Sequence, residues 1–392
     1  MSNEAPLRRI RRAHTWAAVG SVAVVAATLT ACGSSDDAGD ASGSSSSAGG
    51  SDSALAADLA AFTKPLDAYP VPTDPISDVG SLKGKTVYYI PITQQSVQFN
   101  VTQKGLEAAG DAVGITVQTC DGKGTPTDIG ACIGQATDAG AGAIITDAIA
   151  YGLAANGLDA AQAAGIPVII SNQVVDDAHP ASATLDYVAA GGSQMEEALA
   201  SWVIQDSGGK AQVLMDMSTD GPSPAVFAAA GQKVYDENCP DCDVTVNNVS
   251  TSSFSQIPSS TSAALLQNPD VDYVEAQFEQ YAQAVQAGIQ QTSRTDVKVI
   301  AGAAELGGIK QVESGSLAAA AAQAAAFQGW VDMDAAMRLM LGVDVPEYTI
   351  PVRLFTQDTM DDVQLTDEAQ QSGEWFGPAT YTDDFQKVWG IG

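Results

Sequence analysis

From Lys85 onward the sequence alternates short β-branched runs with longer Ala-rich segments whose apolar residues recur at helical spacing. This order is typical of a parallel sheet whose strands are joined by crossover helices. Eight segments are predicted strands, at residues 86–92, 116–119, 143–146, 168–171, 211–215, 244–249, 273–276 and 297–301. Eight are predicted helices, at residues 97–113, 127–139, 151–164, 191–205, 222–237, 259–268, 281–292 and 307–313. The pattern predicts an α/β fold of two doubly wound, Rossmann-like parallel-sheet lobes in series.

Ligands of open α/β sheets bind at the carboxyl ends of the strands. Functional side chains are therefore expected directly after each predicted strand. The residues at these positions are Gln94, Gln95, Ser96, Asp147, Asn172 and Gln173 in the first unit, and 216–220, Phe254, 277–280 and 303–305 in the second. They are rich in amides and aromatic rings and nearly free of cations, which indicates a binding surface.

The N-terminus has the pattern of an export signal. Four arginines between residues 8 and 12 precede an apolar run at 16–29, which is too short to cross a membrane. The run ends in Leu29-Thr30-Ala31-Cys32, which resembles the bacterial lipobox, so we expect residues 1–31 to be removed and Cys32 to carry lipid. An incidental thiol at Cys32 behind an ordinary secretory signal is the alternative. The arginine pairs leave the general and twin-arginine export routes open.

Residues 33 to about 60 are dominated by Gly, Ser, Ala and Asp and offer little to bury. We therefore expect residues 32–81 to be a lipid anchor and flexible tether. About 310 residues follow, enough for two domains with a core each.

The charge balance excludes some partners. The chain has 17 Lys+Arg and 47 Asp+Glu, and removal of four Arg and one Glu with the signal leaves 13 against 46, a formal charge of −33. Such a field disfavours nucleic acid and anionic lipid surfaces. Acidity is also common in secreted proteins.

Four cysteines follow Cys32, an even number in an exported chain. Pairing that is local in sequence predicts the disulfides Cys120–Cys132 and Cys239–Cys242. A zinc site would need the two pairs to meet, and a redox role for the Cys239-Pro240-Asp241-Cys242 motif would usually need a helix N-terminus.

The sequence gives no sign of catalysis. Its two histidines are His14 in the signal and His179 in a loop, and no Gly-x-Ser-x-Gly elbow, P-loop or dinucleotide-binding glycine motif follows a predicted strand. Adjacent carboxylate pairs at 196–197 and 361–362 point apart. We expect no enzyme, no cofactor and no metal site.

From about Lys85 to Phe355 the chain resembles the type I periplasmic binding proteins, in the branch of ribose- and galactose-binding proteins. The resemblance rests on order and spacing. Its best segments are 87–114, Gly-Ile-Pro-Val-Ile at 165–169, Gly191-Gly192, Asn-Pro-Asp-Val at 268–271, and 315–319 leading to Gln323.

The resemblance implies two lobes joined by a three-segment hinge that closes over the ligand. The crossings would lie near residues 186–188, 323–326 and 351–354. The lobes would be 82–187 plus 324–350, and 188–323 plus 352–392. Within the second, segments 375–378 and 385–389 are expected to dock on that lobe, with a partner-binding tail as the alternative.

The resemblance also implies ligand contacts. Phe99 would stack on a sugar ring, Phe254 would form an aromatic wall, and the hinge residue Gln323 would bond the ligand. The full predicted set is Gln95, Ser96, Gln98, Phe99, Asp147, Asn172, Gln173, Phe254, Gln277, Phe278 and Gln323.

Several positions depart from the sugar binders. Gln98 replaces an aromatic residue, Asn172-Gln173 replaces Asp-Arg, and Val226, Phe278 and Ala303 replace an Arg, an Asn and an Asp. Loop drift could instead bring other carboxylates into place, namely Asp147, Asp220, Glu279 or Glu305. Without drift, the ligand is less hydroxylated than a hexose or more apolar, held by burial against Phe99, Phe254, Phe278 and Tyr281.

The expected function is that of an extracytoplasmic substrate-binding lipoprotein of an ABC importer. It would capture a small neutral solute, such as a sugar, a polyol or a related compound, and present it to a membrane permease. We expect a monomer held at the outer face of the cell membrane by its lipid. The alternative is a membrane-tethered sensor subunit read by a receptor or kinase.

Overall fold

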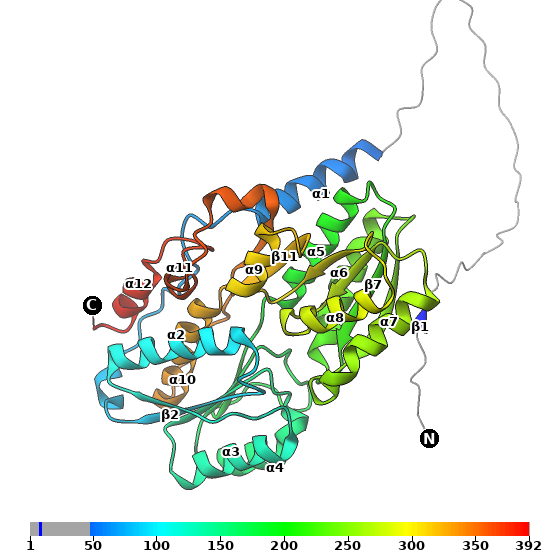
Figure 1. The fold of residues 1–392 in the computed structure, drawn as a ribbon. Coiled ribbons are helices and arrows are strands. Elements are labelled where there is room, and N and C mark those ends of the chain that lie inside the picture. Colours follow the sequence, from blue (N-terminus) through cyan, green and yellow to red (C-terminus); the bar gives the residue numbers. More distant parts are fainter. Residues whose placement is uncertain (1–7, 10–47, 392) are drawn as a thin grey trace, which may run out of the picture.

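The computed structural model describes residues 8–9 and 48–391, and the first lobe is built on a five-stranded parallel sheet (Figure 1). Its strand order is β3 (Thr116–Thr119), β2 (Thr86–Pro91), β4 (Ala143–Asp147), β5 (Val168–Ser171) and β6 (Leu185–Val188). Its helices are α2 (Val97–Val113), α3 (Pro126–Asp138), α4 (Tyr151–Ala163) and α10 (Ala325–Leu341). We call this unit lobe 1.

Lobe 2 has a seven-stranded sheet. Its order is β1 (Arg8–Arg9), β8 (Asp243–Val249), β7 (Gln212–Ser218), β9 (Tyr273–Ala276), β10 (Lys298–Ala301), β11 (Ala319–Gln323) and β12 (Val352–Thr356). The two outer strands, β1 and β12, are antiparallel to their neighbours. Its helices are α5 (Gly192–Asp206), α6 (Ser223–Asn238), α7 (Ile257–Gln267), α8 (Glu279–Gln291) and α9 (Leu306–Glu313).

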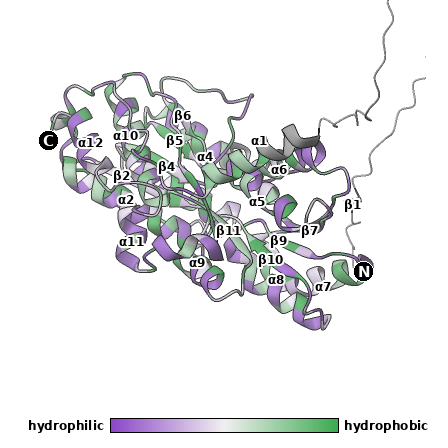
Figure 2. Cartoon of the chain, turned by 90° about the horizontal axis from the view of Figure 1, so that it is seen from above, coloured by the Kyte–Doolittle hydropathy of each residue, from purple (hydrophilic) through white to green (hydrophobic). Residues whose placement is uncertain are grey.

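The prediction of two doubly wound lobes is confirmed. Strands β4 and β5 are buried along their whole length, and Figure 2 shows hydrophobic residues along the strands and hydrophilic residues on the outer helices. Helices on both faces of a parallel sheet require strands of this continuously apolar kind. The chain passes between the lobes after β6, after β11 and again between α10 and β12.

Helix α10 follows β11 of lobe 2 but packs on lobe 1, against α2 and strands β4, β5 and β6. Two glycines permit the close approach of α2 and α10. A Cβ at Gly105 would lie 2.3 Å from the carbonyl oxygen of Ala326, and one at Gly329 would lie 2.4 Å from that of Thr102. The returning helix is thus locked to the first lobe by backbone-to-backbone packing.

The N-terminal segment differs from the expected tether of 32–81. Helix α1 (Ala48–Phe62) packs on α5 and α6, with Leu59 buried in the core of lobe 2. The chain then runs to lobe 1, where Tyr69 stacks on Phe327 and the 3-10 turn Val79–Leu82 contacts α2 and α10. Large apolar residues spaced along 55–82 supply enough burial to order this stretch, so these residues are part of the folded body and not of a flexible tether as predicted.

The C-terminal segment also reaches both lobes. The Trp375 backbone carbonyl accepts a 2.6 Å hydrogen bond from Arg353 of β12, as expected for lobe 2. Helix α12 (Tyr381–Val388) packs instead on α10, where Trp389 stacks on Trp330 at 5.3 Å. The prediction that 385–389 docks on lobe 2 is wrong, because α10 of lobe 1 offers the Trp389 indole an aromatic ring, Trp330, and a hydrogen-bond acceptor, Asp334.

Both predicted disulfides are confirmed. Cys120–Cys132 ties the end of β3 to α3 in lobe 1, and Cys239–Cys242 closes the turn between α6 and β8 in lobe 2. Among the described residues no cluster of side chains could hold a metal ion and no helix is long and apolar enough to cross a membrane. The predicted lipidation site Cys32, and the signal apart from Arg8–Arg9, lie outside the described residues.

Candidate ligand-binding site

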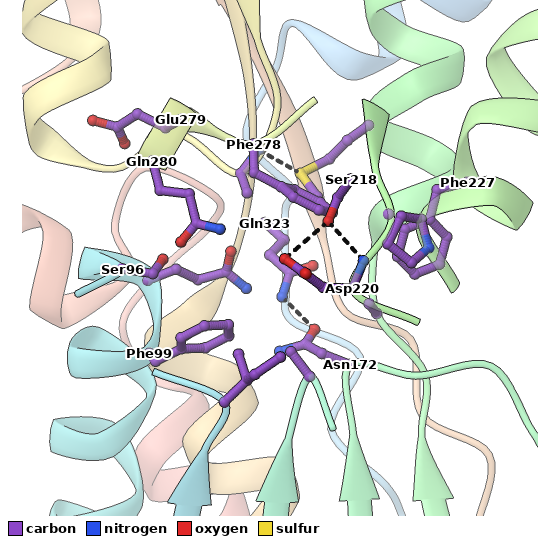
Figure 3. A pocket seen from close by; sticks show the side chains of 18 of the residues that line it. Ser96, Phe99, Asn172, Ser218, Asp220, Phe227, Phe278, Glu279, Gln280 and Gln323 are labelled. Atoms are coloured by element: carbon purple, nitrogen blue, oxygen red, sulfur yellow. Dashed lines mark hydrogen bonds between the residues drawn. The ribbon is translucent and has the colours of Figure 1, made fainter. Parts of the chain in front are cut away.

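A cavity of about 670 Å³, including space open to solvent, lies between the carboxyl ends of the two sheets (Figure 3). Lobe 1 contributes segments that follow β2, β4 and β5, and lobe 2 contributes segments that follow β7, β9 and β10 and the starts of α5 and α6. The lining residues are Ile92, Ser96, Gln98, Phe99, Ala148, Asn172, Gln173, Ala190, Gly192, Met195, Ser218, Asp220, Pro224, Phe227, Thr251, Phe278, Glu279, Gln280, Ala303 and Gln323. This is where open α/β sheets place their ligands.

Most of the predicted ligand-binding residues line this cavity. They are Ser96, Gln98, Phe99, Asn172, Gln173, Phe278 and Gln323. Four others do not line it, namely Gln95, Asp147, Phe254 and Gln277. That the seven lining residues contact a ligand stays a prediction. For the other four, the structure shows why their side chains do not face the cavity.

Asp147 and Gln277 are buried behind the cavity wall. Asp147 accepts a 2.6 Å hydrogen bond from the side-chain amide of Asn172. Gln277 accepts one of 2.8 Å from the backbone N–H of Ser218 and donates to a backbone carbonyl of α6. Each therefore positions a lining residue instead of facing the cavity.

Gln95 and Phe254 lie outside the cavity for a different reason. Gln95 is exposed in the turn before α2. Phe254 belongs to the unpredicted 3-10 turn Thr251–Gln256, which leaves its ring 40 % exposed beside Tyr281, while Thr251 at the start of the turn lines the cavity. A helical turn in place of an extended loop moves the expected aromatic wall out to the rim.

Gln323 ends β11 at a crossing between the lobes, and its side-chain amide is committed within the protein. Its oxygen accepts the backbone N–H of Gly191 at 2.9 Å. Its nitrogen donates to Asn172 Oδ1 at 2.9 Å and to Gln328 Oε1 at 2.6 Å. A primary amide has two N–H groups, so in this conformation Gln323 has no hydrogen left to donate to a ligand.

Gln98 is the opposite case. It lies in the first turn of α2 and lines the cavity, and only 7 % of it is exposed. Its amide has no hydrogen-bond partner among the protein groups of residues 48–391, and the same holds for the hydroxyl of its neighbour Ser96. Buried amides are almost always hydrogen-bonded, and the Gln98 side chain faces a cavity partly open to solvent, so a ligand there can replace water as its partner.

Two of the alternative carboxylates, Asp220 and Glu279, reach the cavity, whereas Asp147 and Glu305 are buried behind it. Glu279 is turned toward the N-terminus of α9, where its Oε2 accepts the backbone N–H of Glu305 at 2.6 Å. Burial raises the pKa of Glu279 to about 7, although backbone hydrogen bonds from Glu305 and Gly308 favour its charged form.

Asp220 is the lining carboxylate that lies toward the middle of the cavity (Figure 3). Its Oδ2 accepts hydrogen bonds from Thr251 Oγ1 at 2.6 Å, from Thr251 N at 2.8 Å and from Tyr281 Oη at 3.1 Å. None of the described lining residues is Lys, Arg or His. An anionic ligand would be buried here without a cationic partner, which is strongly unfavourable.

Phe227 is the lining residue that the sequence prediction missed most clearly. Its ring lies against α5 so closely that a Cβ at Gly192 would be 2.4 Å from it. The neighbouring Val226, at the position matched to an Arg of the sugar binders, is 47 % exposed and does not line this cavity. Pro222 and Pro224 mark a helix start directly after β7, and that signal places the first turn of α6, with Phe227, at the cleft.

Two α/β lobes joined by three crossings, with a cavity at those crossings, define a two-lobed binding protein of the periplasmic type. Residues 87–343 match the periplasmic binding protein domain, and the chain belongs to this family. The family consists of binding proteins, not enzymes, and its ribose- and galactose-binding branch is the one that the sequence resembles. No curated protein sequence matches the chain.

Several solved structures of proteins in complex with sugars share the fold. A protein from Mycobacterium smegmatis in complex with β-D-fucofuranose is 18 % identical over 75 % of this chain and 98 % of its own, with a TM-score of 0.63. A solute-binding protein from Agrobacterium vitis bound to α-D-tagatopyranose is 21 % identical over 71 % and 96 %, at 0.63. A 5-methylthioribose-binding protein from Thermotoga lettingae is 17 % identical over 78 % and 97 %, at 0.64.

Proposed function

We propose that this chain is the extracytoplasmic substrate-binding lipoprotein of an ABC importer, and that it captures a small neutral solute such as a sugar or polyol. The cavity at the lobe crossings carries the proposal, because its lining combines amides, hydroxyls and three phenylalanines with no cation among the described residues. The compounds bound by the similar structures are neutral and hydroxylated, which supports the same ligand class.

Binding would proceed by closure of the lobes about their crossings, with no covalent chemistry. The ring of Phe99 would stack on the ligand from lobe 1, and Phe278 and Phe227 would cover it from lobe 2. The closed form would then be presented to a membrane permease. The mature chain would act as a monomer, held by lipid on Cys32 at the outer face of the membrane.

The ligand class is tested on the chain from residue 33 onward, which keeps α1 in place. Native mass spectrometry would identify a co-purified solute, and calorimetry would compare neutral sugars and polyols with matched charged compounds, such as glucose with gluconate and glucosamine. We expect binding among the neutral compounds. Binding confined to the charged members would contradict the proposal.

The anchor and the transport role need a test in cells. Wild-type chain should incorporate labelled fatty acid and fractionate with membranes, and the Cys32→Ser variant should do neither. Deletion of the gene should abolish uptake of the solute found above, and the wild-type chain should restore it. Normal uptake in the deletion strain would favour a sensor role over import.

A further inference from the structure

Amide and hydroxyl side chains that face the cavity gather at one end, where Gln280 also lies within hydrogen-bonding reach of Tyr281, and the carboxylate of Asp220 lies between the two ends. Ser96 and Gln98 come from the start of α2 in lobe 1, and Gln280 comes from the start of α8 in lobe 2. Figure 3 shows the Gln280 side chain directed toward Ser96 from the opposite lobe. We call these three residues the amide end.

The opposite end has no free polar side chain among its described residues. Met195, Phe227 and Ala303 line it, Phe278 extends the apolar surface toward the middle of the cavity, and we call these four residues the apolar wall. Met195 lies one helical turn after Gly192, against which the Phe227 ring is seated. The backbone N–H of Ala303 is directed at the sulfur of Met195, at 3.3 Å, so it is not free for a ligand.

Three of the four wall residues pack together in lobe 2. Met195 and Ala303 belong to one buried cluster of lobe 2, and Phe278 packs against the same cluster. In Figure 3, Phe227 lies on the side of the cavity opposite to Ser96 and Gln280, with Phe278 and Asp220 between them. A ligand that fills the cavity therefore meets amides at one end and hydrocarbon at the other.

We propose that the ligand is an amphipathic neutral sugar or polyol, with hydroxyl groups at the amide end and a deoxy carbon, alkyl or alkylthio substituent against the apolar wall. This inference rests on the proposed function and narrows its ligand class. A hydroxyl placed against the wall would lose its hydrogen bonds to water and find no partner. A methyl or methylthio group there would instead gain burial against three hydrophobic side chains and the Ala303 methyl.

Matched pairs of probes test this on the chain from residue 33 onward. Calorimetry would compare D-galactose with D-fucose, L-mannose with L-rhamnose, and D-ribose with 5-deoxyribose and 5-methylthioribose. Within a pair whose stereochemistry fits the cleft, the deoxy or methylthio member should bind at least about tenfold more tightly. A tenfold change corresponds to about 1.4 kcal/mol.

The Ala303→Asp variant supplies the decisive comparison. Ala303 has a φ of 51°, in the left-handed region where Asp is tolerated better than most residues, and the new carboxylate would face the apolar wall. We expect the variant to lose the preference for the deoxy member or to reverse it. Ser293→Asp is the control, because Ser293 is exposed, is not among the lining residues and has a φ of 58°.

The possible results distinguish a failure of the amphipathic ligand from a failure of the proposed ligand class. Equal or tighter binding of the fully hydroxylated member, unchanged by Ala303→Asp, would overturn the amphipathic ligand and leave the sugar-binding function standing. If no sugar or polyol of either kind binds, the inference and the proposed ligand class are both wrong. Loss of binding in the Ser293→Asp control would show that added charge alone disturbs the protein and would remove the support given by Ala303→Asp.

Discussion

Two glutamines of the same cavity have opposite surroundings. Gln323 uses its oxygen and both N–H groups on Gly191, Asn172 and Gln328, whereas Gln98 has no protein partner among the described residues. Identical side chains should therefore respond differently to the same substitution.

For Gln98→Ala, we expect ligand affinity to fall by about tenfold, because one or two hydrogen bonds to the ligand are lost. The unliganded protein should melt within about 2 °C of wild type, since no bond within the protein is broken. Calorimetry and thermal unfolding measure the two quantities. A large loss of stability with normal affinity would show that Gln98 is structural.

For Gln323→Ala, we expect a loss of stability of about 2–3 kcal/mol. Truncation leaves the Gly191 N–H and the Gln328 oxygen buried without partners. Affinity should also fall, because Asn172 loses the donor that orients it. Urea unfolding of the unliganded protein gives the first effect, and unchanged stability would contradict it.

The sequence could place these residues but could not describe their bonding. The rule that ligands meet the carboxyl ends of strands found Asn172, and the resemblance to the sugar binders added Gln98 and Gln323. Whether a side chain faces the cavity or the layer behind it depends on contacts between segments far apart in the chain. Asp147, drawn back to Tyr89 and Asn172, illustrates this.

At the scale of elements, α12 is attached to α10 by an aromatic cluster. Trp389 stacks on Trp330 at 5.3 Å with an interplanar angle of 9°, and its indole N–H donates to Asp334 at 2.7 Å. Asp334 also pairs with the buried Arg338 at 2.7 Å. The terminal helix therefore completes a polar network inside lobe 1.

The Trp389→Ala variant should lose about 3–5 kcal/mol of stability, because a fully buried indole is replaced by a cavity. Ile391→Ala is the matched control, since Ile391 is 39 % exposed, and it should change stability by less than about 0.5 kcal/mol. Denaturant unfolding compares the two. Equal stability of both variants would mean that α12 does not contribute to the fold.

Two of the elements that the sequence prediction missed lack the signals on which it relied. Strand β11 is Ala-Ala-Ala-Ala-Gln and carries no β-branched residue, so its strand character comes only from the partners on both sides. Helix α10 is buried around almost its whole circumference and shows no polar stripe. β-branched runs and amphipathic spacing found even fully buried strands such as β4 and β5, but β11 and α10 carry neither signal.

At the scale of the whole molecule, buried carboxyl groups make stability depend on pH. Burial raises the pKa of Asp147 and of Asp216 to about 6, and that of Glu279 to about 7. Unfolded carboxyls titrate near pH 4. Between these values the folded protein binds more protons than the unfolded chain, so the free energy of unfolding falls as pH rises through about 4 to 7.

We therefore expect the melting temperature to be higher at pH 5 than at pH 8, by several degrees. Protonation also reduces the self-repulsion of a chain with a formal charge of −30. Asp216→Asn, neutral at every pH, should flatten the dependence, whereas Asp383→Asn at an exposed position should not. A melting temperature that rises from pH 5 to pH 8 would contradict the role of these buried groups.

The docking of α1 on lobe 2 changes how far the binding protein can travel. If Cys32 is lipidated, the chain between that anchor and Leu55, the first side chain packed on the body, has about 23 residues instead of the 50 expected from sequence. At no more than about 3.5 Å per residue, this connecting segment spans less than roughly 80 Å. The two lobes would then stay within a thin layer above the membrane. Their encounters with a permease would occur by diffusion in the plane of the membrane.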